Sequence, residues 1–178
     1  TGAFWALDTS LAHRRHFPAI SWTKSYTLYG SQIRGWYEEN VAHDWQELRD
    51  RAMFILQKET ELQEIVQLVG PDALPESEKV ILEIARMLRE DFLQQFAFDD
   101  VDAYCPPKKA YIMLKVIMAF SDATVAALNR GVSLRQVLDL PIKDRIATMK
   151  TTPHEEALEG LPVFASELAE EIAGIEVY

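Results

Sequence analysis

A long stretch with a helical period, residues 44–69, constrains the fold of this chain more than any other feature. Its apolar residues recur in alternating steps of three and four, which places them on one face of a helix, with Glu59 as the one interruption. These residues are Trp45, Leu48, Ala52, Ile55, Leu62, Val66 and Val69. Gly70 and Pro71 then form a strong stop signal. The pattern predicts a long amphipathic helix that must bury one side against other elements.

The sequence that follows predicts further helices packed against this one. Pro75 suits the first turn of a helix over 76–95, which would pair with 44–69 as an antiparallel hairpin. Other helices are expected over 21–29, 31–40 and 107 to about 129, in short segments after Ser133 and Pro141, and in an acidic segment after Pro153 that Gly160 and Pro162 interrupt. The sequence therefore predicts a helical bundle.

One element at the start of the chain does not fit a bundle. Ala3–Leu7 is a strand-like run that ends at a turn signal, Asp8. One short strand cannot make a sheet, so we expect its partner to lie upstream in a longer chain. The predicted fold is mainly α, with a helical bundle domain over 21–178 and a short remnant of an α/β domain over 1–20. Without the rest of its sheet, we expect this remnant to be poorly anchored.

Composition and charge exclude several kinds of partner. The net charge of −10 and the pI of about 4.9 argue against nucleic acid, because binding to phosphates requires a basic surface. No apolar run approaches the ~20 residues needed to span a bilayer, so we expect no direct membrane insertion. The single cysteine, Cys105, cannot form an internal disulfide, which fits a reducing cytoplasm.

Motifs for catalysis or metal binding are missing from this sequence. His13 and His16 flank two arginines, but Zn²⁺ needs three or four ligands, so we expect a basic surface or interface patch and no metal site. Neither a phosphate loop of the form GxxxxGK[ST] nor GxSxG nor HExxH occurs. Cys105 has no paired base and is expected to be structural. We predict no catalytic residue in these 178 residues.

Aromatic residues near the end of the second hairpin helix have two interpretations. Phe92 and Phe96 have helical spacing, which favours packing in the core. Phe98 and Tyr104 lie beyond the helix in a stretch rich in Asp, where aromatic rings can stack on a flat base. Filling space in the core remains the alternative for them as well.

Three long motifs carry a resemblance to a known family. They are FWALDTSLAHRRHFPAISW at 4–22, ELQEIVQLVGPDALPESEK at 61–79 and EDFLQQFAFDDVDAYCPP at 90–107. In this order they resemble the C-terminal part of the catalytic A subunit of archaeal-type and vacuolar-type (V/A-type) rotary ATP synthases and ATPases, with the archaeal type closer. The β subunit of F-type ATPases carries a similar order of features. The resemblance covers essentially the whole chain.

The resemblance implies a role for three aromatic residues. In the family, aromatics from the first and third motifs clamp the adenine ring of ATP or ADP, which binds with Mg²⁺ in the parent subunit. Phe17 and Phe98 match those positions, with Tyr104 as a third wall. Phe96 stands where members of the family usually have Asn, and it adds bulk beside the clamp. The 1–20 segment would then be the end of a nucleotide-binding domain.

The resemblance also implies partners and a place in the cell. The tip of the hairpin would contact the central rotor stalk through Asp72, Leu74, Glu76, Ser77 and Glu78. The B subunit would alternate with this subunit in a hexamer and supply a transition-state arginine. The assembly couples ATP synthesis or hydrolysis to proton transport, and the subunit would lie peripherally on the cytoplasmic face of the cell membrane.

Parts that the family needs for catalysis are not in this sequence. The phosphate loop, the catalytic carboxylate and the Mg²⁺-holding groups lie upstream in the family, so we predict that this chain alone is inactive and binds no nucleotide tightly. One alternative is a non-enzymatic helical interaction module whose aromatics are structural. Another is the homologous non-catalytic subunit, which HRRHFPAI and DFLQQ disfavour.

Overall fold

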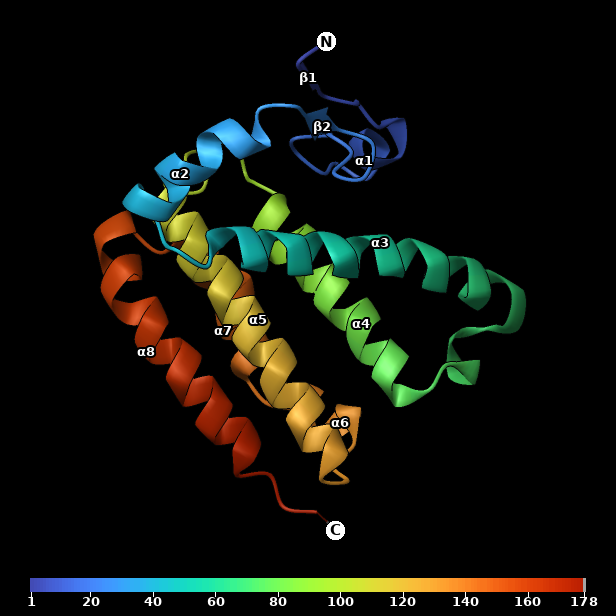
Figure 1. Ribbon diagram of the computed structural model, residues 1–178. Coiled ribbons are helices and arrows are strands. Elements are labelled where there is room, and N and C mark those ends of the chain that lie inside the picture. Colours follow the sequence, from blue (N-terminus) through green and yellow to red (C-terminus); the bar gives the residue numbers. More distant parts are fainter. Residues whose placement is uncertain (178) are drawn as a thin grey trace.

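The computed structural model describes residues 1–177 and is mainly helical (Figure 1). Its strands and α-helices are β1 (Ala3–Phe4), α1 (Thr9–His13), β2 (Tyr26–Thr27), α2 (Gly30–Asn40), α3 (Trp45–Val69), α4 (Glu76–Met87), α5 (Pro107–Asn129), α6 (Leu134–Leu138), α7 (Ile142–Thr148) and α8 (His154–Ala173). The described part also has two 3₁₀ turns, η1 (Pro71–Ala73) and η3 (Met149–Thr151), and a π-helical segment, η2 (Leu88–Leu93). The predicted mainly α fold with a small N-terminal strand-containing piece is confirmed.

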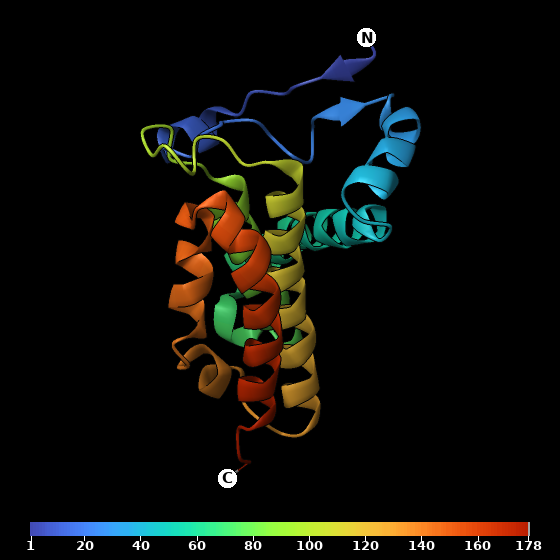
Figure 2. The same ribbon diagram turned by 90° about the vertical axis from the view of Figure 1, so that its left-hand side faces the viewer.

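Helix α5 forms the centre of the core. It lies beside α8, and both helices run in the same direction because α6 and α7 carry the chain back between them (Figures 1 and 2). Ile117 and Phe120 of α5 and Leu168 of α8 are fully buried. The predicted bounds of α5 are confirmed. A proline suits its first turn, and Gly131, with φ of 96°, follows its end.

The apolar character of α5 corrects one expectation. Among residues 1–177, α5 is long and apolar enough to cross a membrane by length and composition, so our statement that no apolar run has this length is wrong. The same composition is typical of a helix at the centre of a core. Nine of its residues are buried inside the fold, and it contacts α8, α4 and α3. These contacts account for the composition.

Helices α3 and α4 form the predicted hairpin, an arm beside α5 (Figure 1). Leu48 and Leu62 lie buried on the predicted face of α3, whereas Val69 at its far end is 61% exposed. Glu59 is buried on that same face and pairs with Arg89 of η2, whose Nη2 lies 2.9 Å from Oε1. An ion pair therefore explains the one interruption in the apolar pattern.

Two predicted helices differ from those in the structure. The helix expected over 76–95 is α-helical to Met87 and continues as η2 to Leu93, where the wider π turn shifts the positions of later side chains. Pro162 does not interrupt the last helix, because α8 continues through it. Buried Phe164 and Leu168 hold the C-terminal half of α8 against the core, and such packing supplies most of the stability of a helix in a protein.

The N-terminal strand has a partner within this chain, so it is not the single unpaired strand that the sequence suggested. β1 pairs with β2 in antiparallel register, with Phe4 opposite Tyr26, and an isolated bridge joins Leu7 to Ile20. The segment 21–29 is thus a strand with turns and not the predicted short helix, because its aromatic residues also suit a strand. The domain division at residue 20 stays a prediction.

Candidate functional site

Phe17 and Phe98, far apart in the sequence, line one surface pocket. This aromatic pocket has a volume of about 620 Å³, within the range of pockets that bind small molecules. It is lined by Arg15, Phe17, Gln94, Gln95, Phe96, Ala97, Phe98 and Lys150. Three phenylalanines supply its apolar walls, and the only charged groups in its lining are two cations.

Backbone contacts hold the loop of Phe17 against the end of η2. The Gln95 amide donates a hydrogen bond of 2.7 Å to the Phe17 carbonyl. The His16 ring is buried, and its Nε2 lies 2.9 Å from the carbonyl oxygen of Arg89. At His16 and Phe17, contrary to our expectation for the first twenty residues, the segment is therefore anchored to the helical part. The expected basic surface patch is also incomplete, since His16 belongs to the interior.

A buried aspartate fixes the second loop of the pocket. Asp102 is 3% exposed, and its Oδ2 accepts a hydrogen bond of 2.7 Å from the Phe96 amide. Its carbonyl accepts a second one, at 2.9 Å, from the Gln95 side chain. Asp99 Oδ1 accepts the amides of Val101 and Asp102. The loop therefore presents its aromatic residues from a hydrogen-bonded turn.

The aromatic rings of the pocket are available to a ligand. Phe98 is 89% exposed, and its ring meets that of Phe96 edge-on at 5.9 Å between centroids. Phe17 is 52% exposed on the other loop. Exposed π-faces can stack on a planar ring, at ~1–3 kcal/mol per base in nucleic-acid complexes. Arg15 and Lys150 add positive charge, which suits a planar ligand that carries an anionic group.

The structure brings together two of the three predicted aromatic residues. Tyr104 is 73% exposed and lies on the same loop as Phe98, but it does not line the pocket, and Phe96 lines it instead. Sequence reasoning missed Arg15 and Lys150 as pocket residues. Arg15 belongs to the basic cluster that the sequence drew attention to, whereas the sequence around Lys150 carries no such signal.

The tip of the hairpin differs in part from a simple acidic loop. Asp72 and Ser77 are exposed, whereas Leu74 is 6% exposed and turns inward. Glu76 accepts a hydrogen bond of 3.3 Å from the Leu134 amide of α6. Apolar side chains of α3 reach the surface here, since Leu68 is 85% exposed. The accessible tip is therefore a mixture of acidic, polar and apolar groups.

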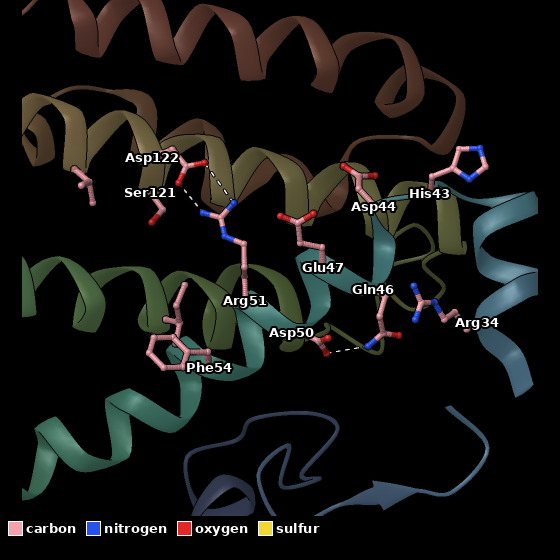
Figure 3. A pocket seen from close by; sticks show the side chains of 12 residues that line it. Arg34, His43, Asp44, Gln46, Glu47, Asp50, Arg51, Phe54, Ser121 and Asp122 are labelled. Atoms are coloured by element: carbon pink, nitrogen blue, oxygen red, sulfur yellow. Dashed lines mark hydrogen bonds and ion pairs between the residues drawn. The ribbon is translucent and has the colours of Figure 1, made fainter. Parts of the chain in front are cut away.

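A larger pocket lies between α3 and α5 and contains none of the predicted site residues (Figure 3). This α3–α5 groove has a volume of about 850 Å³ and is lined by Arg34, His43, Asp44, Gln46, Glu47, Asp50, Arg51, Phe54, Ile55, Ser121, Asp122 and Val125. Arg51 reaches across it to Asp122, with Nη2 2.6 Å from Oδ1, and Gln46 donates to Asp50 at 2.8 Å. Four of its polar residues are thus paired with one another within the groove.

Other reactive groups offer little chemistry. Within residues 1–177, no group of three or more His, Cys, Asp or Glu side chains is arranged to hold a metal ion. Cys105 is half-buried, and this burial raises the pKa of its thiol, so the reactive thiolate is disfavoured. The expectation that Cys105 is structural agrees with this environment.

Comparison with known proteins identifies the helical part of the chain. The family model for the C-terminal domain of V and A type ATP synthase matches residues 34–138, more than half of the chain. This range includes the arm, η2, the loop of Phe98 and all of α5.

Curated relatives extend the match over nearly the whole chain. The A subunit of the A-type ATP synthase of Methanopyrus kandleri is 56% identical over 168 residues, which are 94% of this chain and 28% of that protein. The corresponding A subunit of Desulfurococcus sp. is 53% identical over 95% of the chain, and one from Methanospirillum hungatei is 58% identical over 84%. The chain spans little more than a quarter of the length of these relatives. It belongs to the family of the C-terminal domain of V and A type ATP synthases, and its relatives are A subunits of the archaeal type.

Proposed function

We propose that this chain is the part of a catalytic A subunit that forms the adenine side of the nucleotide site and carries the arm that contacts the central stalk. The parent would be a proton-translocating V/A-type ATP synthase, in which ATP synthesis or hydrolysis is coupled to rotation. The relatives are named as A subunits of A-type ATP synthases, and the chain corresponds to only part of each of them.

The observation that carries this proposal is the convergence of Phe17 and Phe98 on one pocket. The two rings come from loops that are joined by the hydrogen bond between the Gln95 amide and the Phe17 carbonyl. Adenine is planar and would stack between such rings, which tolerate any base because they use only its π-face. Tyr104 would have to move, or meet the ligand outside the pocket, to form a third wall.

The phosphates of the nucleotide and its Mg²⁺ would be held elsewhere in the parent subunit. The lining of the aromatic pocket has no carboxylate, and Mg²⁺ prefers oxygen ligands, so these residues do not fit the metal. The sequence also has no phosphate loop. The chain would therefore supply binding energy for the base, while phosphoryl transfer depends on positioning groups outside it and on the adjacent B subunit.

The decisive experiment replaces Phe98 by Ala in the complete subunit that carries this sequence, assembled with its B subunit. We expect the Kd for ATP to rise about tenfold or more, because one aromatic face is lost from the base site. The matched control is Phe54→Ala, since Phe54 is 63% exposed on α3 and lies outside the aromatic pocket. If both variants bind ATP like the unchanged protein, the alternative of a non-enzymatic helical interaction module gains support.

The arm is tested separately by cross-linking in the assembled complex at the membrane. Ser77→Cys places a thiol at the exposed tip, and we expect it to form disulfides or reagent-bridged products with a central stalk subunit. Ser166→Cys, also exposed but on α8, is the matched control and should not do so. Equal labelling at both positions, or none at Ser77, would contradict the proposed contact.

A further inference from the structure

Two lysines, Lys109 and Lys150, connect the core to the aromatic pocket through successive hydrogen bonds. Lys109, near the start of α5, is 1% exposed. Its ammonium donates hydrogen bonds of 2.7 Å to the carbonyls of both Lys150 and Thr152. A buried ammonium needs such partners, because an unpaired charge away from water is costly. Lys109 therefore fixes the turn η3 from which the side chain of Lys150 extends.

The second lysine reaches from η3 to the end of η2. Its ammonium donates to the carbonyl of Glu90 at 2.9 Å and to that of Gln94 at 3.0 Å. Carbonyls in the last turn of a helix lack partners within the helix, and they favour a nearby cation. Hydrogen bonds from a charged donor are among the stronger ones in proteins. Lys150 thus holds the π-helical segment at the point where the chain leaves it.

The backbone that Lys150 holds is the beginning of the pocket wall. Three consecutive amides there have partners: Gln94 donates to Arg89, Gln95 to Phe17, and Phe96 to the carboxylate of Asp102. A shift of Gln94 would therefore change the spacing between the loop of Phe17 and the loop of Phe98. The Lys150 side chain also lines the pocket itself.

We propose that Lys150 is a positioning residue for the base, and that Lys109 sets the position of Lys150. We call this pair of lysines the relay, and we call the side of the pocket formed by Phe96 and Phe98 the wall. The relay holds the wall at the distance from Phe17 that a planar base requires. The ligand in this inference is the adenine nucleotide of the proposed function, on which it rests. The effect on the order of the wall does not depend on any ligand.

The first test measures the order of the wall without nucleotide. Lys150→Met keeps most of the side-chain stem and removes the three donors. By hydrogen exchange on the complete subunit, we expect the amides of residues 94–96 to exchange about tenfold faster or more, while those in the middle of α5 are unchanged. Lys143→Met is the matched control, a half-buried lysine of α7 without a hydrogen bond or ion pair among the described residues. A purely structural role would raise exchange in α5 as well.

The second test measures the affinity of the subunit for ATP. In the assembled subunit, we expect Lys150→Met to raise the Kd for ATP about tenfold at an unchanged melting temperature. Lys150→Arg, which can still donate to two carbonyls, should restore the affinity to within about threefold. Lys109→Met combined with Lys150→Met should weaken binding no more than Lys150→Met alone, because both act through the same contacts.

The outcomes separate this inference from the proposed function. If Phe98→Ala weakens ATP binding but Lys150→Met changes neither the exchange nor the Kd, the relay is wrong and the adenine wall stands. If Lys150→Met speeds exchange at 94–96 but neither variant alters ATP binding, the relay orders the wall, and the assignment of adenine to the pocket fails. Unchanged exchange at 94–96 overturns the relay in every case.

Discussion

The carboxylate of Glu59 and the guanidinium of Arg89 form an ion pair between the arm and η2. Arg89 Nε lies 3.1 Å from both carboxylate oxygens, and Nη2 lies 2.9 Å from Oε1. The side chains are 7% and 17% exposed. The Arg89 carbonyl meanwhile faces the ring of His16 in the pocket loop. One residue thus connects the arm, through its side chain, with the pocket, through its backbone.

Breaking this pair should destabilise the fold strongly. We expect Glu59→Leu to lower the free energy of unfolding by about 3 kcal/mol, because Arg89 keeps a charge that is largely removed from water. The double change Glu59→Leu with Arg89→Leu should recover most of that loss, since two apolar side chains can pack together. Urea unfolding of the four combinations measures the coupling.

An exposed ion pair provides the contrast. Arg51→Ala removes the partner of Asp122 in the α3–α5 groove, where both side chains are well exposed. We expect a loss of no more than about 1 kcal/mol, because solvent screens such pairs. Equal costs at the two sites would show that burial does not set the strength of the Glu59–Arg89 pair.

Asp91 should make stability depend on pH. Burial raises the pKa of this carboxyl to about 6, while Arg86 and Lys150 oppose the shift. Since the folded state holds the proton more tightly than the unfolded one, stability should fall as pH rises from about 4 to 6, by up to about 3 kcal/mol. Asp91→Asn removes this penalty, so the variant should be more stable at pH 7.5 and equal to the unchanged protein near pH 4. If the stability of the two proteins changes with pH in parallel, Asp91 is not the source of the pH dependence.

The core around α5 should be sensitive to lost volume. Phe120 is fully buried, so Phe120→Ala removes a large side chain from close packing, and we expect a loss of about 3–5 kcal/mol. Phe54→Ala, on the surface of α3, should change stability by about 0.5 kcal/mol or less. Thermal unfolding of both variants tests this, and a small effect at Phe120 would indicate a core that relaxes around the cavity.

This chain alone should bind ATP weakly or not at all. Stacking offers only ~1–3 kcal/mol per base, and the aromatic pocket has no cradle for phosphates. Calorimetric titration of the 178-residue chain with ATP measures this directly. Micromolar affinity would mean that Arg15 and Lys150 hold the phosphates well enough to replace the missing loop.

Local signals in the sequence account for much of the fold. Proline at its start and glycine after its end marked α5, and the apolar period marked α3, because both signals act within a few residues. The pairing of β1 with β2 depends on residues more than twenty positions apart, and the aromatic residues near Tyr26 suit a helix or a strand equally well. The choice between helix and strand in this segment is made by tertiary contacts, which short-range sequence signals do not record.

The residues of the candidate site were likewise predictable only in part. Phe17 and Phe98 were found through long motifs shared with a family, and the pocket that joins them agrees with that pairing. Lys150 arrives from the turn after α7, and its partners are backbone carbonyls, which carry no side-chain identity for a sequence motif to record. The extra width of η2 likewise has no signature in Leu88–Leu93.

The turn at the end of the arm has a mechanical consequence. Leu74 is buried there, and Glu76 accepts the amide of Leu134, so the turn is attached to α6 as well as to its own two helices. Because α4 continues directly into η2 and its first residue, Glu76, is hydrogen-bonded to α6, both ends of this helix are attached to the rest of the fold. These two attachments should limit how far the arm can bend independently of the helices around it.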